Sequence, residues 1–130
     1  MADILIVEDN DMLNKAYRIV LEKNGHTVEA ATNGSDALDI IEKFKPKVIL
    51  LDLLMPKMGG LEFLRQYDAI KANKDVKVVV LTNLGKEENI QEALDLGAYK
   101  YIIKAHSSPA DLAALVNHLI KKNVEEPEAK

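Results

Sequence analysis

Five side chains of complementary chemistry stand within or directly after short apolar runs of this sequence. They are three carboxylates, one hydroxyl and one amine: Glu8, Asp9, Asp52, Thr82 and Lys104. Asp52 is the most unusual of them, because it interrupts the aliphatic run VILLDLLM at residues 48–55. An ionised carboxylate is costly to bury unless it is paired, hydrogen-bonded or bound to a cation. The pattern therefore predicts an acidic site rather than a set of unrelated surface charges.

Clustered carboxylates need positive charge among them, because otherwise they repel one another. The chain has no cysteine, and an all-oxygen site suits a hard divalent ion such as Mg²⁺. A carboxylate can also attack phosphorus and form an aspartyl phosphate. A metal ion, a lysine and a hydroxyl would then neutralise the oxygens of the transferred group, which is most of what phosphoryl transfer requires. We therefore expect a strand to carry Asp52 to the rim of a phosphoryl-transfer site.

Alternating strand and helix patterns would bring these groups together. Five short apolar runs predict strands: Ile4–Val7, Thr27–Ala31, Val48–Leu51, Val76–Leu81 and Tyr101–Ile103. The segments that follow them have helical spacing, so the strand–helix unit occurs five times. This alternation predicts an α/β fold, a doubly wound five-stranded parallel sheet with helices on both faces. Ligands of such sheets bind beyond the carboxyl ends of the strands, which is where the five polar residues stand.

The helical segments carry their own signals. In the first, Gly25 marks the end, and one buried stripe is expected: Met12, Leu13, Ala16, Ile19 and Val20. The last has Ser108 as N-cap, Pro109 at the first helical position and Asp111 three residues beyond the cap. Gly59–Gly60 is compatible either with a loop-to-helix hinge or with a loop that moves beside the third strand.

Length and composition predict one folded domain. The chain has 130 residues, 48% hydrophobic and 29% charged. A net charge of −4 without a basic stripe argues against direct nucleic-acid binding. We see no signal peptide and no apolar run of the roughly 20 residues that cross a bilayer, so we expect a cytoplasmic protein without a membrane partner. We expect residues 1–122 to form the domain and 123–130 to be a flexible tail or the start of a linker. The three histidines lack ligand spacing, and we expect them to be exposed or half-buried: His26, His106 and His118.

Four segments resemble, in order and spacing, the receiver domains of two-component response regulators. They are ILIVEDN, VILLDLLMPKMGG, VVVLTN and GAYKYIIKAHSSPADL, and the resemblance covers residues 3 to about 122. It implies the flavodoxin-like (βα)₅ fold with strand order 2-1-3-4-5. It also implies a phosphoacceptor switch, which catalyses only its own phosphorylation and dephosphorylation and is not an enzyme of metabolism.

The resemblance implies a role for each acid. Asp52 would accept a phosphoryl group from a sensor histidine kinase, a phosphotransfer protein or a small phosphodonor. Asp9 would bind Mg²⁺ directly and Glu8 through water. Asp52 and the backbone carbonyl of Leu54 would complete the protein ligands.

The resemblance also implies a switch. Thr82 would hydrogen-bond the phosphoryl oxygen, and Lys104 would pair with the phosphate. Tyr101 would swing inward as Thr82 moves, which converts a local charge event into a changed surface. That surface, formed by the last strand and the helices on either side of it, would bind a downstream protein that the sequence does not identify.

Several positions depart from the family pattern, among them Asn83. Lys104 is followed by Ala105, where the family usually has proline. A cis bond without proline costs about 3 kcal/mol, so we predict a trans bond here. Leu54 and Leu84 are apolar, and neither can orient a water molecule for attack. We therefore expect the acyl phosphate to hydrolyse slowly.

Two other functions are compatible with the same fold. The first is a protein-binding module whose output does not depend on phosphorylation. Ala105 and the unusual Asn83 favour it, whereas the complete set of polar residues opposes it. The second is a phosphatase with an aspartyl intermediate. That class typically has a second acid two residues after the nucleophile, and Leu54 stands there instead.

Overall fold

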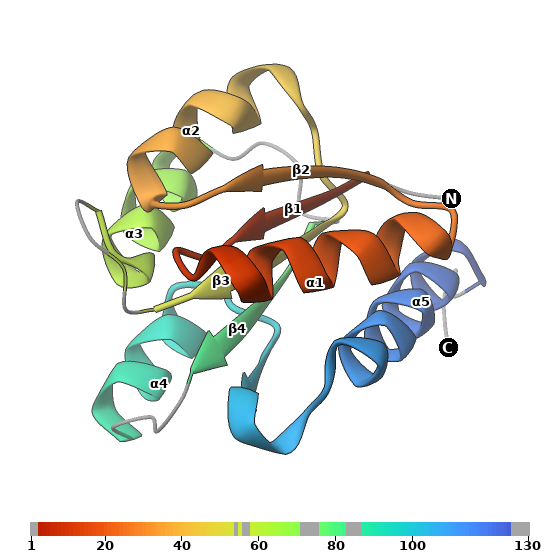
Figure 1. Cartoon of the computed structure of the whole chain (residues 1–130). Helices are drawn as coiled ribbons and strands as arrows, with labels where there is room; N and C mark the ends of the chain where they lie inside the picture. Colours follow the sequence, from red (N-terminus) through yellow and green to blue (C-terminus); the bar gives the residue numbers. More distant parts are fainter. Residues whose placement is uncertain (1–2, 54, 56–57, 71–75, 83–86, 126–130) are drawn as a thin grey trace.

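The computed structural model describes residues 3–53, 55, 58–70, 76–82 and 87–125. In this part of the chain, strands and helices alternate (Figure 1). The strands are β1 (Asp3–Val7), β2 (Thr27–Ala31), β3 (Val48–Asp52), β4 (Lys77–Thr82) and β5 (Lys100–Ile103). The helices are α1 (Asp11–Lys23), α2 (Gly34–Lys43), α3 (Gly60–Ile70), α4 (Glu87–Asp95) and α5 (Pro109–Glu125), and a 3₁₀ turn, η1, covers Lys104–His106.

The strands form one parallel sheet in the order β2-β1-β3-β4-β5. This confirms the predicted doubly wound fold, and each strand begins and ends within one residue of its predicted range. Val7 lies opposite both Ala31 and Leu51, so β1 and β3 end at the same level. The carboxyl ends therefore meet at one edge of the sheet.

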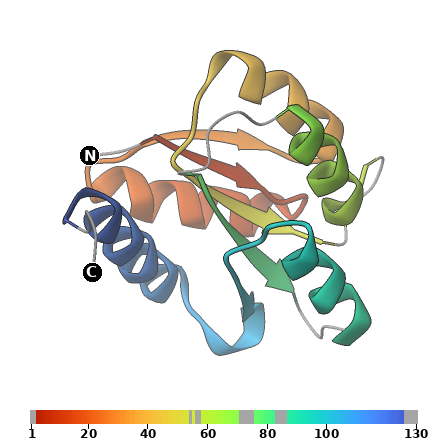
Figure 2. The same ribbon diagram turned by 180° about the vertical axis from the view of Figure 1, so that it is seen from behind.

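Helices cover both faces of the sheet and create two cores (Figures 1 and 2). One core lies under α1 and α5 and contains Tyr17, Leu50 and Leu112. The other lies under α2, α3 and α4 and contains Ile41, Leu51 and Phe63. Consecutive residues of a strand point to opposite faces, so the continuous aliphatic runs fill both cores at once.

The buried face of α1 differs from the predicted stripe. Met12 is 83% exposed and Ile19 41% exposed, whereas Asn14, Tyr17 and Leu21 are buried. Asn14 explains the rotation, because its amide must reach backbone carbonyls at the ends of β1 and β2. The buried face of α1 is therefore centred on the hydrogen-bonded Asn14 and not on the apolar residues that the spacing alone predicts.

The helix α5 has the N-terminal cap predicted from the sequence, and it is longer at its C-terminal end than expected. Ser108 Oγ accepts from Asp111 N–H (3.1 Å), and Asp111 Oδ2 accepts from Ser108 N–H (3.0 Å), so the predicted cap is a reciprocal one. The helix continues to Glu125, which makes the first three residues of the expected tail helical.

His26 is more deeply buried than the exposed or half-buried position expected for it. It is buried, and its Nε2 lies 2.6 Å from Asn117 Oδ1 of α5. The expectation failed because Asn117 of α5 contacts both Asn24 and His26, which joins the turn after α1 to α5. His106 and His118 are exposed.

Candidate acidic site at the carboxyl edge of the sheet

Three of the five predicted polar residues meet on one side of the sheet, the side covered by α1 and α5. On β1 the alternation that buries Ile6 in this core carries Glu8, two residues later, to the same side. On β3 the same alternation carries Asp52 after Leu50. Lys104 enters from the end of β5, on the far side of β4. Residues far apart in sequence therefore converge because parallel strands end at one edge.

The ammonium of Lys104 bridges the two buried acids. Its Nζ lies 2.8 Å from Glu8 Oε1 and donates to Asp52 Oδ2 at 3.1 Å. The side chains of Lys104, Glu8 and Asp52 are only 8%, 0% and 7% exposed. The Lys104–Ala105 bond is trans, as predicted. The lysine thus reaches Asp52 although no proline follows it.

The electrostatics of the site keep this lysine charged. Burial alone lowers the pKa of the Lys104 ammonium, but the contacts with the Glu8 and Asp52 carboxylates outweigh burial, so that the pKa lies above its ordinary value. The site therefore contains a permanent internal cation at neutral pH.

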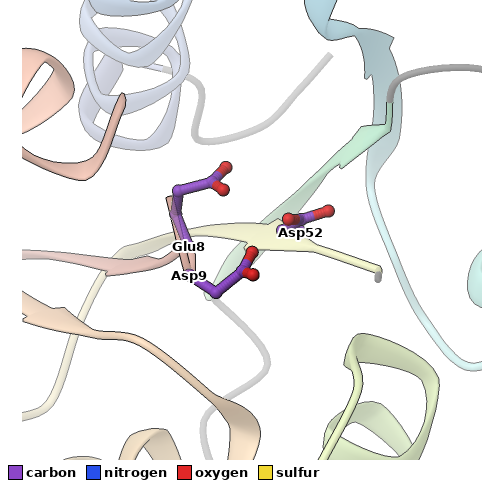
Figure 3. Close-up of side chains that lie close together, drawn as sticks. All are labelled: Glu8, Asp9 and Asp52. Carbon is purple, nitrogen blue, oxygen red and sulfur yellow. The ribbon is translucent and has the colours of Figure 1, made fainter. Parts of the chain in front are cut away.

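Asp9 completes the acidic cluster. One carboxylate oxygen from each of Glu8, Asp9 and Asp52 lies within 4.8 Å of the other two, and Asp9 is the exposed member (Figure 3). Together with Lys104, these acids carry a net charge of −2 when all four groups are ionised. An all-oxygen donor set with this charge fits a hard divalent cation such as Mg²⁺. Leu54, the expected source of a carbonyl ligand, lies outside the described residues.

Thr82 and Tyr101 lie on the neighbouring strands β4 and β5. Thr82 is buried at the end of β4, one residue beyond Leu81, which lies opposite Asp52. The next strand pairs Tyr101 with Val80, and Tyr101 is 44% exposed. Asn83 and Leu84 lie outside the described residues.

Three supporting residues on or beside α1 were missed by sequence reasoning. Asn14 donates from Nδ2 to the carbonyl oxygens of Glu8 (2.9 Å) and Ala31 (3.2 Å), and it thereby ties the ends of β1 and β2 together. Asn10 caps α1 through its side chain and donates its backbone N–H to Glu8 Oε2 (3.1 Å). The available signal was the polar Asn14 inside an otherwise apolar helical face.

Tyr17 is the third missed residue, and it lies buried in the core beneath the site. Burial raises the pKa of its phenol, and the negative charge of Glu8 raises it further. A neutral phenol is therefore kept among the charged groups. Nothing in the apolar pattern distinguished this tyrosine from an ordinary core residue.

Comparison with known proteins gives one consistent result. The response regulator receiver domain family matches residues 4–117. The chain is 37% identical to sporulation initiation phosphotransferase F of Bacillus subtilis over 101 residues, which are 78% of this chain and 80% of that protein. It is 33% identical over 110 residues to the transcriptional regulatory protein YdfI of Bacillus subtilis, covering 83% of this chain and only 50% of YdfI.

A solved structure agrees with these relatives. A CheY-like response regulator receiver domain from Methanospirillum hungatei JF-1 superposes with a TM-score of 0.87 at 27% identity, covering 96% of this chain and 98% of the other. In the part of the chain that the structure describes, no helix has the length and apolar character that a membrane span requires.

Proposed function

The chain belongs to the response regulator receiver domain family, and from this membership we propose that Asp52 is the phosphoacceptor of a two-component signalling switch. The observation that carries the proposal is the position of Asp52. It is a buried carboxylate at the end of β3, with an ammonium donating to one oxygen and two further acids beside it. A purely structural acid would need the ammonium but not the additional acids.

The proposed reaction is an in-line displacement at phosphorus. A carboxylate oxygen of Asp52 attacks the phosphoryl group, the bond from phosphorus to the donor's nitrogen or oxygen breaks, and the electron pair leaves with the donor. Lys104, already beside Asp52, would pair with a phosphoryl oxygen as charge builds up there. Thr82 would supply a hydroxyl to the same group once its strand end moves toward it.

Asp9 and Asp52 would hold Mg²⁺ directly, with Glu8 no closer than the ion's water shell. The bound ion would neutralise phosphoryl charge, which the carboxylates alone would repel. Asp9 suits this role because it is the exposed member of the cluster and can be approached from solvent.

Phosphorylation would be read at the surface of α4, β5 and α5. We propose that Tyr101, now 44% exposed, turns inward as Thr82 moves toward the phosphate. A sensor histidine kinase or phosphotransfer protein would supply the phosphoryl group, and a downstream protein would bind the changed surface. The chain spans about half the length of YdfI, so whatever lies beyond this region of YdfI says nothing about the partner of this chain.

Intact-mass measurement tests the assignment of Asp52. We expect wild-type protein incubated with a small phosphodonor and Mg²⁺ to gain one phosphoryl mass, because the nucleophile and its counter-charges are in place. Asp52→Ala should gain none, since it lacks the attacking oxygen. Wild-type protein with excess chelator is the control for the metal. Equal labelling of Asp52→Ala, or no labelling of wild type with several donors, would contradict the proposal.

A further inference from the structure

Glu8 is the most deeply buried acid of the cluster, and both of its oxygens are engaged by the protein itself. Oε1 lies 2.8 Å from Lys104 Nζ, and Oε2 accepts from the backbone N–H of Asn10 at 3.1 Å. Its side chain is 0% exposed. Asp9, by contrast, is the exposed acid of the cluster.

The backbone of Glu8 is held as firmly as its side chain. Its N–H donates to Ala31 O at 3.0 Å, and its carbonyl accepts from Asn14 Nδ2 at 2.9 Å. These two bonds fasten residue 8 to β2 and to α1. The Glu8 carboxylate is therefore a fixed point that cannot move outward toward the rim without breaking several interactions.

Lys104 depends on this fixed point. It lies in the short turn η1 beyond β5, and among the described residues its ion-pair partners are Glu8 and Asp52. The distance to Glu8 is the shorter one, 2.8 Å against 3.1 Å. On the proposed function Asp52 receives a phosphoryl group and Lys104 then pairs with the phosphate, so Asp52 is not the lasting partner of the lysine. Glu8 can fill that role.

We propose that Glu8 is a positioning residue, which holds Lys104 against Asp52 and leaves metal binding to Asp9 and Asp52. The inference rests on the proposed function for the use that it gives to Lys104. The three acids then have two different roles. Glu8 holds the ammonium of Lys104, and Asp9 and Asp52 bind the exchangeable metal ion.

Two measurements on metal-free and metal-titrated protein separate these roles. The first is the rate of reductive methylation of the Lys104 amine, resolved by peptide mass spectrometry, with the exposed Lys15 as internal reference. The second is the affinity for MgCl₂ measured by calorimetry. Glu8→Gln removes the anchoring charge, and Asp9→Asn is the matched control that removes the charge of the exposed acid.

For Glu8→Gln we expect methylation of Lys104 relative to Lys15 to rise about tenfold, because the amine loses its buried partner. We expect its Mg²⁺ affinity to stay within about threefold of wild type, because no direct ligand is lost. Asp9→Asn should leave Lys104 protected and weaken Mg²⁺ binding at least about tenfold. The circular dichroism spectrum and unfolding curve of each variant confirm that it is folded.

Glu8→Asp tests whether the contact with Lys104 or only the negative charge is needed. It also takes the place of Glu8→Gln if Glu8→Gln does not fold. Glu8→Asp keeps the charge but is one methylene shorter, so we expect it to expose Lys104 as well. Full protection of Lys104 in Glu8→Gln or Glu8→Asp would overturn the proposal, and so would a loss of Mg²⁺ affinity in Glu8→Gln as large as that in Asp9→Asn. The methylation result does not require phosphorylation, so it remains readable if Asp52 proves not to be the phosphoacceptor.

Discussion

At the level of single residues, this protein places charge where burial opposes it. Removing one partner from a buried ion pair costs about 3–5 kcal/mol, because the other charge is left uncompensated. The pairs of Lys104 with Glu8 and Asp52 are of this kind. A well-packed apolar trio of the same size would often be as stable. The charges are therefore better explained by what the site binds than by what it contributes to folding.

Two buried phenols make a prediction about alkaline pH. Burial raises the pKa of Tyr67 and of Tyr17, so the folded state keeps their protons longer than the unfolded state does. The stabilisation is fully present below the unfolded pKa of about 10 and is lost as pH rises toward the folded value, with a slope of up to about 1.4 kcal/mol per pH unit and group. Urea unfolding at pH 8, 10 and 11 measures it.

Tyr67→Phe is the variant that isolates one of these groups. Its unfolding free energy should fall less steeply above pH 10 than that of wild type, whereas the two curves should run parallel between pH 7 and 9. An unchanged slope above pH 10 would show that this phenol does not contribute.

At the level of elements, the start of α3 packs directly against the end of β3. Gly60 donates its N–H to Leu53 O at 2.9 Å. A Cβ on Gly60 would lie 2.5 Å from Asp52 O and 2.8 Å from Leu53 Cα, both of them backbone atoms that cannot rotate away. The sequence left open whether Gly59–Gly60 is a loop-to-helix hinge or part of a loop that moves, and this close approach is a further requirement for glycine at residue 60. Gly60 lets a helix begin directly against the residue that we propose is phosphorylated.

Gly60→Ala should therefore affect both stability and the site. We expect the free energy of unfolding to fall by about 1–3 kcal/mol from overpacking, and phosphorylation to slow because the Asp52 backbone must shift. Urea denaturation and the rate of mass gain with a small phosphodonor measure the two effects.

Gly25→Ala is the matched control for this substitution. Its φ of +91° makes alanine unfavourable by about 1 kcal/mol, but a Cβ there meets nothing within 4 Å. It should lose some stability and keep its phosphorylation rate. A similar slowing in both variants would mean that the effect arises from general destabilisation rather than from contact with Asp52.

At the level of the whole molecule, the site lies at the carboxyl edge of the sheet that separates the two cores. The strands β1 and β3, which lead to the acids, are buried on both faces, so the acids follow the most deeply buried part of the fold. Mutual repulsion of the acids opposes this arrangement, and Lys104 offsets only part of it. A divalent ion that binds the folded state alone would offset the remainder and stabilise the entire domain.

Magnesium should therefore raise the unfolding midpoint. At a concentration 100-fold above its Kd, a ligand specific for the folded state adds about 2.7 kcal/mol, which corresponds to a shift of several degrees. We expect this shift in wild type and not in Asp9→Asn, measured by thermal unfolding against NaCl of equal ionic strength. An equal rise in both proteins, or in NaCl alone, would indicate screening instead of specific binding.

The sequence alone determined the fold and the membership of the acidic set. Apolar runs of strand length with helical spacing between them admit few architectures, and an acid inside an aliphatic run demands an explanation wherever it lies. The helix cap at Ser108 could also be predicted, because Ser108 and its partner Asp111 are only three residues apart. Such features could be predicted because their causes lie within a few residues.

Contacts across the fold were decided only by the tertiary structure. Three such contacts join segments that no local pattern connects. They are the ion pair of Lys104 with Glu8, the hydrogen bond from Asn14 to the end of β1, and the contact of His26 with α5. Hydrophobic periodicity reports which face of a helix is apolar, but it does not report which carbonyl or carboxylate will lie opposite that face. The different roles of the three acids therefore required the positions of their neighbours, since their residue types are nearly the same.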